Sequence, residues 1–276
     1  MADDILREEG LPATTPRYQY QGVKQCLRCF ELELERYDRE GQHGDGLYVI
    51  FDHVDDRSFQ ECFEDDSAES LLVDSLATYN FISHTIVLKM PPSDVHEAAH
   101  RAFSEIFSTW HRGQESRLVP TGDAKVEGFT RKKKPDSSWK TSIHIPGRDV
   151  KWPTILVEAG WAEPMAKLKQ DILFWLRESE QQVKVALTIQ VTRRESVTIK
   201  QWVLDETTRS SVKPIQTMHI TRNRDPRLNQ HQISGSMRIP FEDCFLRAKR
   251  GNESDFVLSN EDLTELAEAV WYCLPE

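Results

Sequence analysis

The spacing of apolar and polar positions follows two different periods along this chain, and the periods predict its elements. Apolar residues recur at helical spacing over four segments: 24–40, 94–112, 163–178 and 261–272. Runs rich in β-branched and aromatic residues predict strands at 47–51, 81–90, 125–130, 136–145, 153–159, 183–191, 197–204, 217–221 and 233–240. Residues 1–17 are polar and contain proline, which predicts a loose arm, and the acidic segment 55–69 is expected on the surface.

The order of these elements predicts a fold class. From residue 94 onward the order is helix, three strands, helix, two strands. A strand, a helix and a further strand in succession are typical of parallel neighbours in one sheet. We therefore expect an α/β protein in which helices flank a mixed sheet. An acidic N-terminal extension should cover residues 1–80, and the main domain should cover residues 81–276.

Two acidic side chains stand at informative places in this order. Asp136 begins the strand 136–145, and Glu158 is a lone carboxylate within an apolar strand. Side chains alternate across a strand, so Asp136 and Lys140 share one face, as do Glu158 and Gly160. If the two strands are neighbours, both carboxylates lie at one end of the sheet. A carboxylate pair there suits a divalent cation with oxygen ligands, and a buried carboxylate without compensation is unfavourable.

These motifs resemble the PD-(D/E)xK nuclease superfamily, which has the restriction-endonuclease-like fold. Pro135-Asp136 stands as the "PD" and Glu158 as the acidic residue of the second half. The longer pattern, over about residues 90–272, is similar to uncharacterised fungal proteins of that superfamily, and it consists of Trp152-Pro153, Glu158-Ala159-Gly160, Lys167-Leu168-Lys169-Gln170-Asp171 and Phe174-Trp175-Leu176. The resemblance implies that Asp136 and Glu158 hold Mg²⁺ or Mn²⁺ and that the protein hydrolyses DNA or RNA phosphodiesters.

The chain departs from the superfamily pattern at one position. Gly160 stands where the motif has its lysine. Lys140, on the Asp136 face, or Lys167, about one turn into the following helix, is expected to supply the charge instead. Glu97 or Glu105 is a candidate for a further carboxylate. Loss of one preorganised donor lowers rates in other hydrolases by about 10²–10³. The alternative function is therefore a catalytically inactive nuclease-fold protein that binds nucleic acid or a protein partner.

Each acidic residue also has a purely structural explanation. Asp136 is suited to a turn after Pro135, and Glu158 to an ion pair with a basic neighbour such as Lys140. Asp171 lies four residues after Lys167, which is the spacing of a helical ion pair. The functional interpretation thus depends on the order and spacing of the motifs together.

Charge is unevenly distributed over the 276 residues, whose formal net charge is −10. Residues 1–75 contain 19 Asp and Glu against 7 Lys and Arg, and the rest contains 26 against 28. A basic run, Arg131-Lys132-Lys133-Lys134, stands directly before Pro135. It is a candidate for phosphate contacts with nucleic acid. A solvated loop and a nuclear localisation signal remain alternatives for the same run.

A second metal motif competes with the first. His96-Glu97-Ala98-Ala99-His100 matches H-E-x-x-H on an expected helix, where the two histidines bind Zn²⁺ and the glutamate acts as a base. A zinc metalloprotease is therefore a third candidate function. Arg101 follows the second histidine, where a buried zinc helix favours an apolar residue, and Glu115 is the proposed downstream ligand.

Cysteine usage and hydropathy suggest the environment of the protein. The five cysteines are scattered and odd in number, and the N-terminal sequence lacks a secretory pattern. Cys26 and Cys29 lie on an expected helix, where packing explains them. No apolar run approaches the roughly 20 residues that span a bilayer. We expect an intracellular protein, in cytoplasm or nucleus, without a membrane-spanning segment.

Overall fold

The computed structural model describes residues 2–39, 47–65, 69–161, 163–225 and 231–274, and it forms two compact units. Unit 1 comprises Met1–Pro92 and Lys125–Lys134, and unit 2 comprises Ser93–Ala124 and Pro135–Glu276. The boundary expected after residue 80 falls inside a hairpin of unit 1, because β3 and β4 pair there with Asn80 opposite Thr85. The units instead divide at Pro92, and a short excursion of the chain returns to unit 1.

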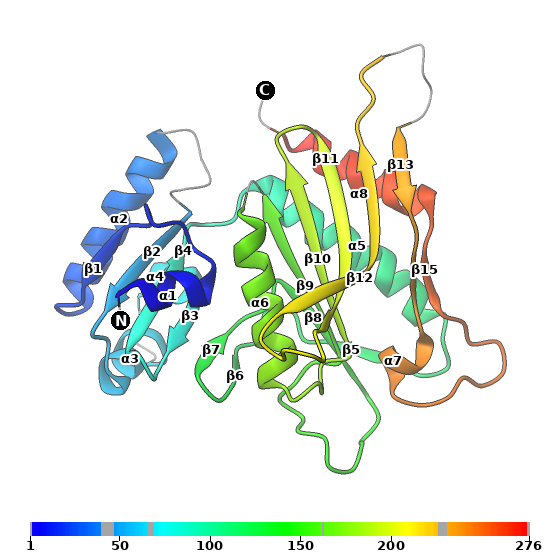
Figure 1. The fold of residues 1–276 in the computed structure, drawn as a ribbon, viewed down its shortest axis with the longest axis horizontal. Coiled ribbons are helices and arrows are strands. Elements are labelled where there is room, and N and C mark those ends of the chain that lie inside the picture. Colours follow the sequence, from blue (N-terminus) through cyan, green and yellow to red (C-terminus); the bar gives the residue numbers. More distant parts are fainter. Residues whose placement is uncertain (1, 40–46, 66–68, 162, 226–230, 275–276) are drawn as a thin grey trace. The chain divides into compact units, whose positions relative to one another are not determined.

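Unit 1 packs helices against a mixed sheet whose strand order is β1-β2-β4-β3-β7-β6 in the described part of the chain (Figure 1). Strands β1 and β2 are parallel, and the other neighbours are antiparallel. Its elements are α1 Ala2–Glu9, β1 Arg17–Gln19, α2 Val23–Arg39, β2 Tyr48–Asp52, α3 Asp56–Phe63, α4 Ser70–Ser75, β3 Leu76–Asn80, β4 Thr85–Lys89, β6 Val126–Glu127 and β7 Arg131–Lys133.

The expected loose arm over residues 1–17 is wrong. Residues 2–9 form α1, which buries Ile5 in the core of unit 1. Glu9 is also buried, and it forms an ion pair with Arg131 of β7. The polar composition of this segment did not indicate the contact, because Arg131 lies 122 residues away from Glu9 in sequence. Cys26 packs in the same core, which confirms the packing explanation for it.

The acidic segment 55–69 also has more structure than its composition suggests. Asp55 caps α3, where its side chain accepts a hydrogen bond from the Ser58 amide at 2.7 Å. Phe59 and Phe63 on this helix are buried. The expected strand 81–90 is a turn followed by β4, and the strand before it, β3, begins at Leu76.

Unit 2 is built on a second mixed sheet of strand order β13-β12-β11-β10-β9-β8-β5, again within the described residues. Strands β9 and β10 are parallel and are joined through α6, while the other neighbours are antiparallel. Its elements are α5 Asp94–Arg112, β5 Leu118–Pro120, β8 Ser137–Thr141, β9 Ile155–Trp161, α6 Met165–Glu178, β10 Val185–Thr192, β11 Ser196–Leu204, β12 Val212–Thr221, β13 Gln232–Gly235, β14 Met237–Ile239, α7 Phe241–Phe245, β15 Phe256–Leu258 and α8 Asn260–Tyr272.

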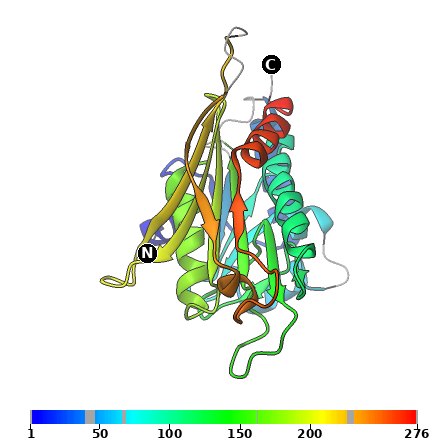
Figure 2. The same ribbon diagram turned by 90° about the vertical axis from the view of Figure 1, so that its right-hand side faces the viewer.

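Helices cover both faces of this sheet. Figure 2 shows α5 and α8 against one face and α6 against the other. Ile155, Val157 and Ala159 of β9 belong to the core cluster that also contains Phe103 of α5 and Leu266 of α8. The alternate residues of β9 therefore point toward α6. All residues of β9 are buried, as expected for a strand covered on both sides.

The mixed α/β architecture predicted from the sequence is confirmed. The helices expected at 94–112, 163–178 and 261–272 are present within two residues, and Ser93 and Ser259 cap two of them. One strand was misassigned, because residues 126–127 and 131–133 belong to unit 1 and the first strand of unit 2 is β5. Among the described residues, no helix is both long enough and apolar enough to span a bilayer.

The ion pair between Glu9 and Arg131 yields a stability prediction for unit 1. Glu9→Gln removes the buried negative charge that the Arg131 guanidinium contacts. The free energy of unfolding should therefore fall by about 3–5 kcal/mol. Amide hydrogen exchange of β3 and β7 measures the loss within this unit. The matched control is Glu35→Gln on the exposed face of α2, which should change stability by less than about 0.5 kcal/mol. Equal exchange rates of the β3 and β7 amides in the Glu9→Gln and Glu35→Gln proteins would contradict the structural role of α1.

Candidate metal centre

The N-terminal half of α5 carries the candidate site. Ser93 begins the helix, and its hydroxyl accepts a hydrogen bond from the His96 amide at 3.3 Å. Apolar residues at helical spacing turn one face of α5 toward the sheet, where Val95, Ala99 and Phe103 are buried. His96 is buried beside them, and His100 lies one turn further along the helix.

A second element, the start of β8, faces this part of the helix. Strand β8 is antiparallel to β9, with Ser137 opposite Val157. Asp136 directly precedes β8, and its Oδ2 accepts a hydrogen bond from the Ala159 amide at 2.6 Å. This side-chain hydrogen bond extends the pairing between β8 and β9 beyond the first residue of β8. It holds the Asp136 carboxylate near α5, where Oδ2 lies 3.3 Å from His96 Nε2.

Glu97 Oε1 is the centre of what we call the α5 cluster: His96, Glu97 and His100. It lies 3.2 Å from His100 Nε2 and 3.6 Å from His96 Nδ1. One ligand atom from each of the three residues falls within 4.8 Å of the others. Side-chain exposure is 29% for Glu97, 12% for His100 and 7% for His96, so solvent reaches the cluster from the Glu97 side.

Both imidazoles of the α5 cluster are held in place by contacts with residues at the start of β8. His96 Nε2 contacts Asp136, and His100 Nδ1 lies 3.0 Å from the Ser137 hydroxyl. Ser104 donates to the carbonyl oxygen of His100 at 2.6 Å and lies 3.1 Å from Ser137. Each ring is thus held at one nitrogen while the other nitrogen faces Glu97 Oε1. Metal-ligating histidines have this arrangement, because a second hydrogen bond fixes the tautomer and the ring orientation.

The electrostatic environment keeps Glu97 ionised. Its pKa is lowered to about 2, chiefly by the neighbouring imidazole of His96, and further by His100 and by the charge of Arg101, while burial opposes the shift. Arg101 Nε donates to Glu97 Oε2 at 2.8 Å. The carboxylate therefore presents an anionic oxygen between two imidazole nitrogens near neutral pH.

The donor set indicates which ions fit. Two imidazole nitrogens and one carboxylate oxygen suit Zn²⁺, Mn²⁺ and related transition metals. Mg²⁺ prefers oxygen ligands and water, so the α5 cluster fits the expected Mg²⁺ poorly and Mn²⁺ better. The motif His96-Glu97-x-x-His100 was visible in the sequence, whereas the supports from Asp136 and Ser137 were not, because they come from a strand 37 residues or more away.

Glu158 lies on the other face of β9. It is buried and accepts a hydrogen bond from Trp175 Nε1 of α6 at 2.5 Å. Asp136 and Glu158 thus contact different helices. Among the described residues, the α5 cluster brings three metal-ligating atoms within 4.8 Å of one another, and it contains neither Asp136 nor Glu158. Their joint role as ligands of one cation stays a prediction.

The two candidate lysines also lie apart from the α5 cluster. Lys167 is buried on α6, where it forms an ion pair with Asp171, as the helical spacing indicated. Lys140 lies four residues along the extended strand from Asp136, a separation of about 13 Å. Neither lysine is brought to the Asp136 carboxylate by a described contact. Their catalytic roles remain predictions, and Glu105 is exposed on α5 away from the cluster.

Packing explains the glycine in the motif. A Cβ atom at Gly160 would lie 3.0 Å from both Glu163 Oε2 and Leu168 Cδ1. The position therefore faces closely packed groups at the start of α6. A lysine side chain has no room there without displacement of those groups.

The basic run forms strand β7 in unit 1 and is not a solvated loop. Arg131 and Lys133 are buried, and Arg131 is paired with Glu9. Lys132 Nζ lies 2.9 Å from Glu64 and 3.3 Å from Glu127, and Lys134 donates to the Val73 carbonyl oxygen at 3.3 Å. These contacts neutralise part of the charge that a phosphate would need. The role of the run in nucleic-acid binding stays untested.

Comparison with known proteins shows a likeness in structure. No protein-family model matches the sequence, and no curated protein matches it. A solved structure from Anabaena variabilis, described as a nuclease candidate of the DUF820 family, is similar with a TM-score of 0.41 and 12% identity. The match covers 71% of this chain and 92% of that chain. It concerns the arrangement of elements alone, and it lends no support to a fungal relationship.

Substitution at Gly160 tests whether the missing lysine reflects packing. Gly160→Lys should lower the free energy of unfolding by about 1–3 kcal/mol, because the added atoms collide with Glu163 and Leu168. Gly160→Ala adds one carbon and should lose less. Denaturation in urea measures both variants. A Gly160→Lys protein as stable as the parent would show that the site accepts the motif residue.

Proposed function

We propose that unit 2 is a transition-metal-dependent phosphodiester hydrolase of the nuclease type, with its metal held by His96, Glu97 and His100. One observation carries the proposal. Each imidazole is braced at one nitrogen by Asp136 or Ser137 and turns the other toward Glu97 Oε1. Hydrogen bonding within a solvated helix face would not require two such supports from a separate strand. The restriction-endonuclease-like assignment and the nucleic-acid substrate follow from the sequence resemblance around Asp136 and Glu158.

The residues of the site would have separate roles in hydrolysis. When bound, the metal would polarise the phosphodiester and lower the pKa of a coordinated water. Asp136 orients His96, and Ser137 orients His100, so the ligand geometry is preorganised. Arg101 has 76% of its side chain exposed and is bonded to Glu97. It offers a positive charge at the accessible side of the cluster, where charge develops on the phosphoryl oxygens.

Two alternatives share the same site. A catalytically inactive nuclease-fold protein that binds nucleic acid or a protein partner is favoured by the packing at Gly160 and by the pairing of Lys167 with Asp171. Neither arrangement supplies a replacement for the motif lysine. A zinc metalloprotease uses the same histidine spacing, with the glutamate as base. Here Glu97 is ion-paired with Arg101, which reduces its basicity. The experiments below separate the three functions.

Metal binding should depend on the α5 cluster. Titration with Co²⁺, followed by its visible absorption, should show one bound ion per chain. His100→Ala should abolish the signal, and Asp136→Asn should weaken affinity by about 10–100-fold, because it removes the charge that contacts His96 Nε2. The control is Glu105→Gln, an exposed carboxylate on the same helix, which should bind normally. Unchanged Co²⁺ binding by His100→Ala would refute the site.

Cleavage should require the same residues. With Mn²⁺, the protein should cut single- or double-stranded DNA or RNA, His100→Ala should abolish product formation on gels, and Asp136→Asn should reduce it. Glu105→Gln should retain activity. Metal binding without cleavage of any substrate would establish the inactive alternative. Cleavage of a casein substrate alone, lost in His100→Ala, would establish the protease.

Glu158 distinguishes the α5 cluster from the carboxylate pair that the resemblance implies. Glu158→Gln removes a buried charge that accepts a hydrogen bond from Trp175, so stability should fall by about 1–3 kcal/mol. Co²⁺ affinity should not change, because the residue faces α6. Loss of Co²⁺ binding in Glu158→Gln together with retention in His100→Ala would instead place the metal between Asp136 and Glu158.

A further inference from the structure

We propose that unit 2 has a second binding site, for a phosphate-type oxyanion, at the end of β8 opposite Asp136. A pocket of about 60 Å³ lies there. Its basic lining residues are Lys140, His144 and Arg148, and Ile143, Ile145, Val150 and Trp152 supply apolar walls. The strand ends at Thr141, earlier than the sequence pattern predicted, so the following residues form this wall.

Arg148 shapes the pocket. Its guanidinium donates to the carbonyl oxygens of Gln182 at 2.5 Å and Pro153 at 3.0 Å, and to the Thr154 hydroxyl at 3.3 Å. These hydrogen bonds hold the loop between β8 and β9 against the segment that follows α6 and against the residues before β9. The acceptors are all neutral. The positive charge of Arg148 is therefore fixed in place but not compensated by them.

The cations of the pocket are in direct contact with no carboxylate of the described residues, although Asp149 is near enough to act on both of them electrostatically. In the part of the chain that the structure describes, no carboxylate oxygen lies within 4.0 Å of a Lys140 or Arg148 nitrogen, while Asp149 lies 3.5 Å from Lys151. Burial lowers the pKa of Lys140, and the charge of Arg148 lowers it further, although Asp149 opposes this. Burial also lowers the pKa of Arg148. Two cations partly removed from water disfavour each other, and a bound anion relieves both effects.

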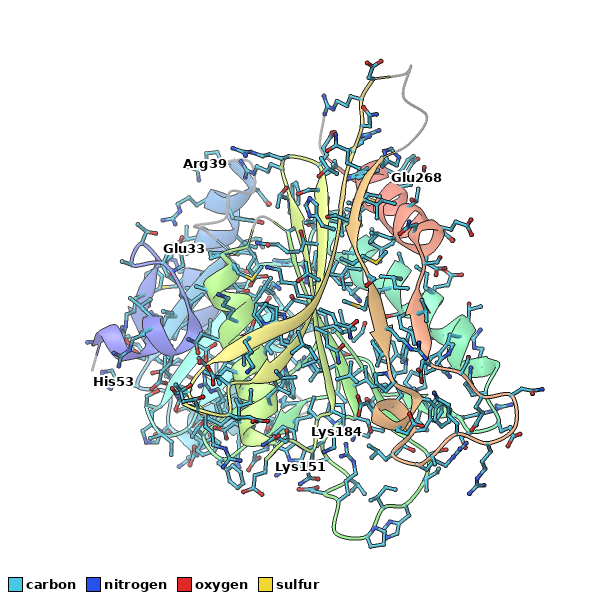
Figure 3. All side chains as sticks on the ribbon, turned by 45° about the vertical axis from the view of Figure 1, so that its right-hand side comes forward. Glu33, Arg39, His53, Lys151, Lys184 and Glu268 are labelled. Atoms are coloured by element: carbon cyan, nitrogen blue, oxygen red, sulfur yellow. The ribbon has the colours of Figure 1, made fainter. Side chains whose placement is uncertain are left out.

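Further positive charge lies at the same end of unit 2. Figure 3 labels Lys151 and Lys184 there. The Lys184 amide donates to the Thr154 carbonyl oxygen at 2.9 Å, which places that residue beside the loop that Arg148 fastens. Lys151 Nζ lies 5.3 Å from the ring centroid of Trp152, a residue of the pocket wall. Two further lysines, of which Lys151 is paired with Asp149 at 3.5 Å, therefore lie near the pocket.

Size and chemistry favour a single phosphate-type group. Pockets for drug-sized ligands measure about 300–1,000 Å³, so this pocket suits a small ion or one group of a larger molecule. Lys140 supplies a mobile charged donor for phosphate, and Arg148, whose guanidinium donates to protein acceptors, adds a fixed positive charge beside it. The site is distinct from the α5 cluster, so the proposal does not depend on the proposed function.

Titration with inorganic phosphate tests the site. Binding is followed by calorimetry at constant ionic strength, with chloride as the reference anion. The parent protein should bind phosphate, and Lys140→Gln should weaken binding about tenfold, because one charged donor is lost. Lys140→Arg should restore part of the affinity. The control Lys213→Gln, an exposed lysine of β12, should bind like the parent.

Oligonucleotides identify the source of the phosphate group. One strand carries a 5′-phosphate, and a second strand of identical sequence carries none. Preference for the first, lost in Lys140→Gln, supports a terminal phosphomonoester as ligand, and equal binding of both, also lost in Lys140→Gln, supports a phosphodiester. Binding of inorganic phosphate alone supports a free anion. The proposal fails if no probe binds the parent, or if every affinity is the same in a folded Lys140→Gln protein.

Discussion

Unit 2 depends on the burial of strand β9 between two neighbouring strands and two layers of helix. Each of its residues is buried, and its neighbours β8 and β10 pair with it along opposite edges. Such a strand has no tolerance for a change of register, because a shift by one residue would exchange its two faces. Two acidic groups of this unit take their positions from that constraint. Asp136 is held by the Ala159 amide, and Glu158 is held against Trp175.

The same strand separates two kinds of charged environment. On the α6 face, Lys167, Asp171 and Trp175 follow at intervals of four residues and are buried. Charges in such a place are stabilised by their partners and are poorly accessible to a substrate. On the α5 face, the cluster around Glu97 is partly open to solvent and is supported from the strand behind it. A ligand-exchanging metal requires this second kind of environment, in which the ligands are fixed and one side is accessible.

The two proposed sites use opposite ends of strand β8. Asp136 precedes its first residue, and Lys140 stands near its last. A short strand thus connects a centre rich in imidazole and carboxylate with a pocket rich in cations. If both are occupied in one complex, their separation of about 13 Å along the strand exceeds the reach of one phosphate group. Each site then contacts a different part of a long ligand, or a different molecule.

Local patterns in the sequence determined most of the elements of unit 2. Helical spacing and serine caps identify α5 and α8, because capping and amphipathicity act within a few residues. The H-E-x-x-H spacing likewise determines that His96 and His100 share one face of a helix. The excursion of residues 125–134 into unit 1 had no such signal, since a short strand with a basic sequence is recognisable only with its partners, such as Glu9.

The sequence by itself thus determined the fold class, the long helices α2, α5, α6 and α8, and the presence of metal-binding residue types. Tertiary structure alone decided which of these residues meet. It placed Asp136 and Ser137 behind the two histidines, and it turned Glu158 toward α6. It also joined Arg148 to the backbone near α6 and left Lys140 beside it. The physical reason is that strand pairing and face alternation act over tens of residues, whereas motif spacing reports only on neighbours along one element.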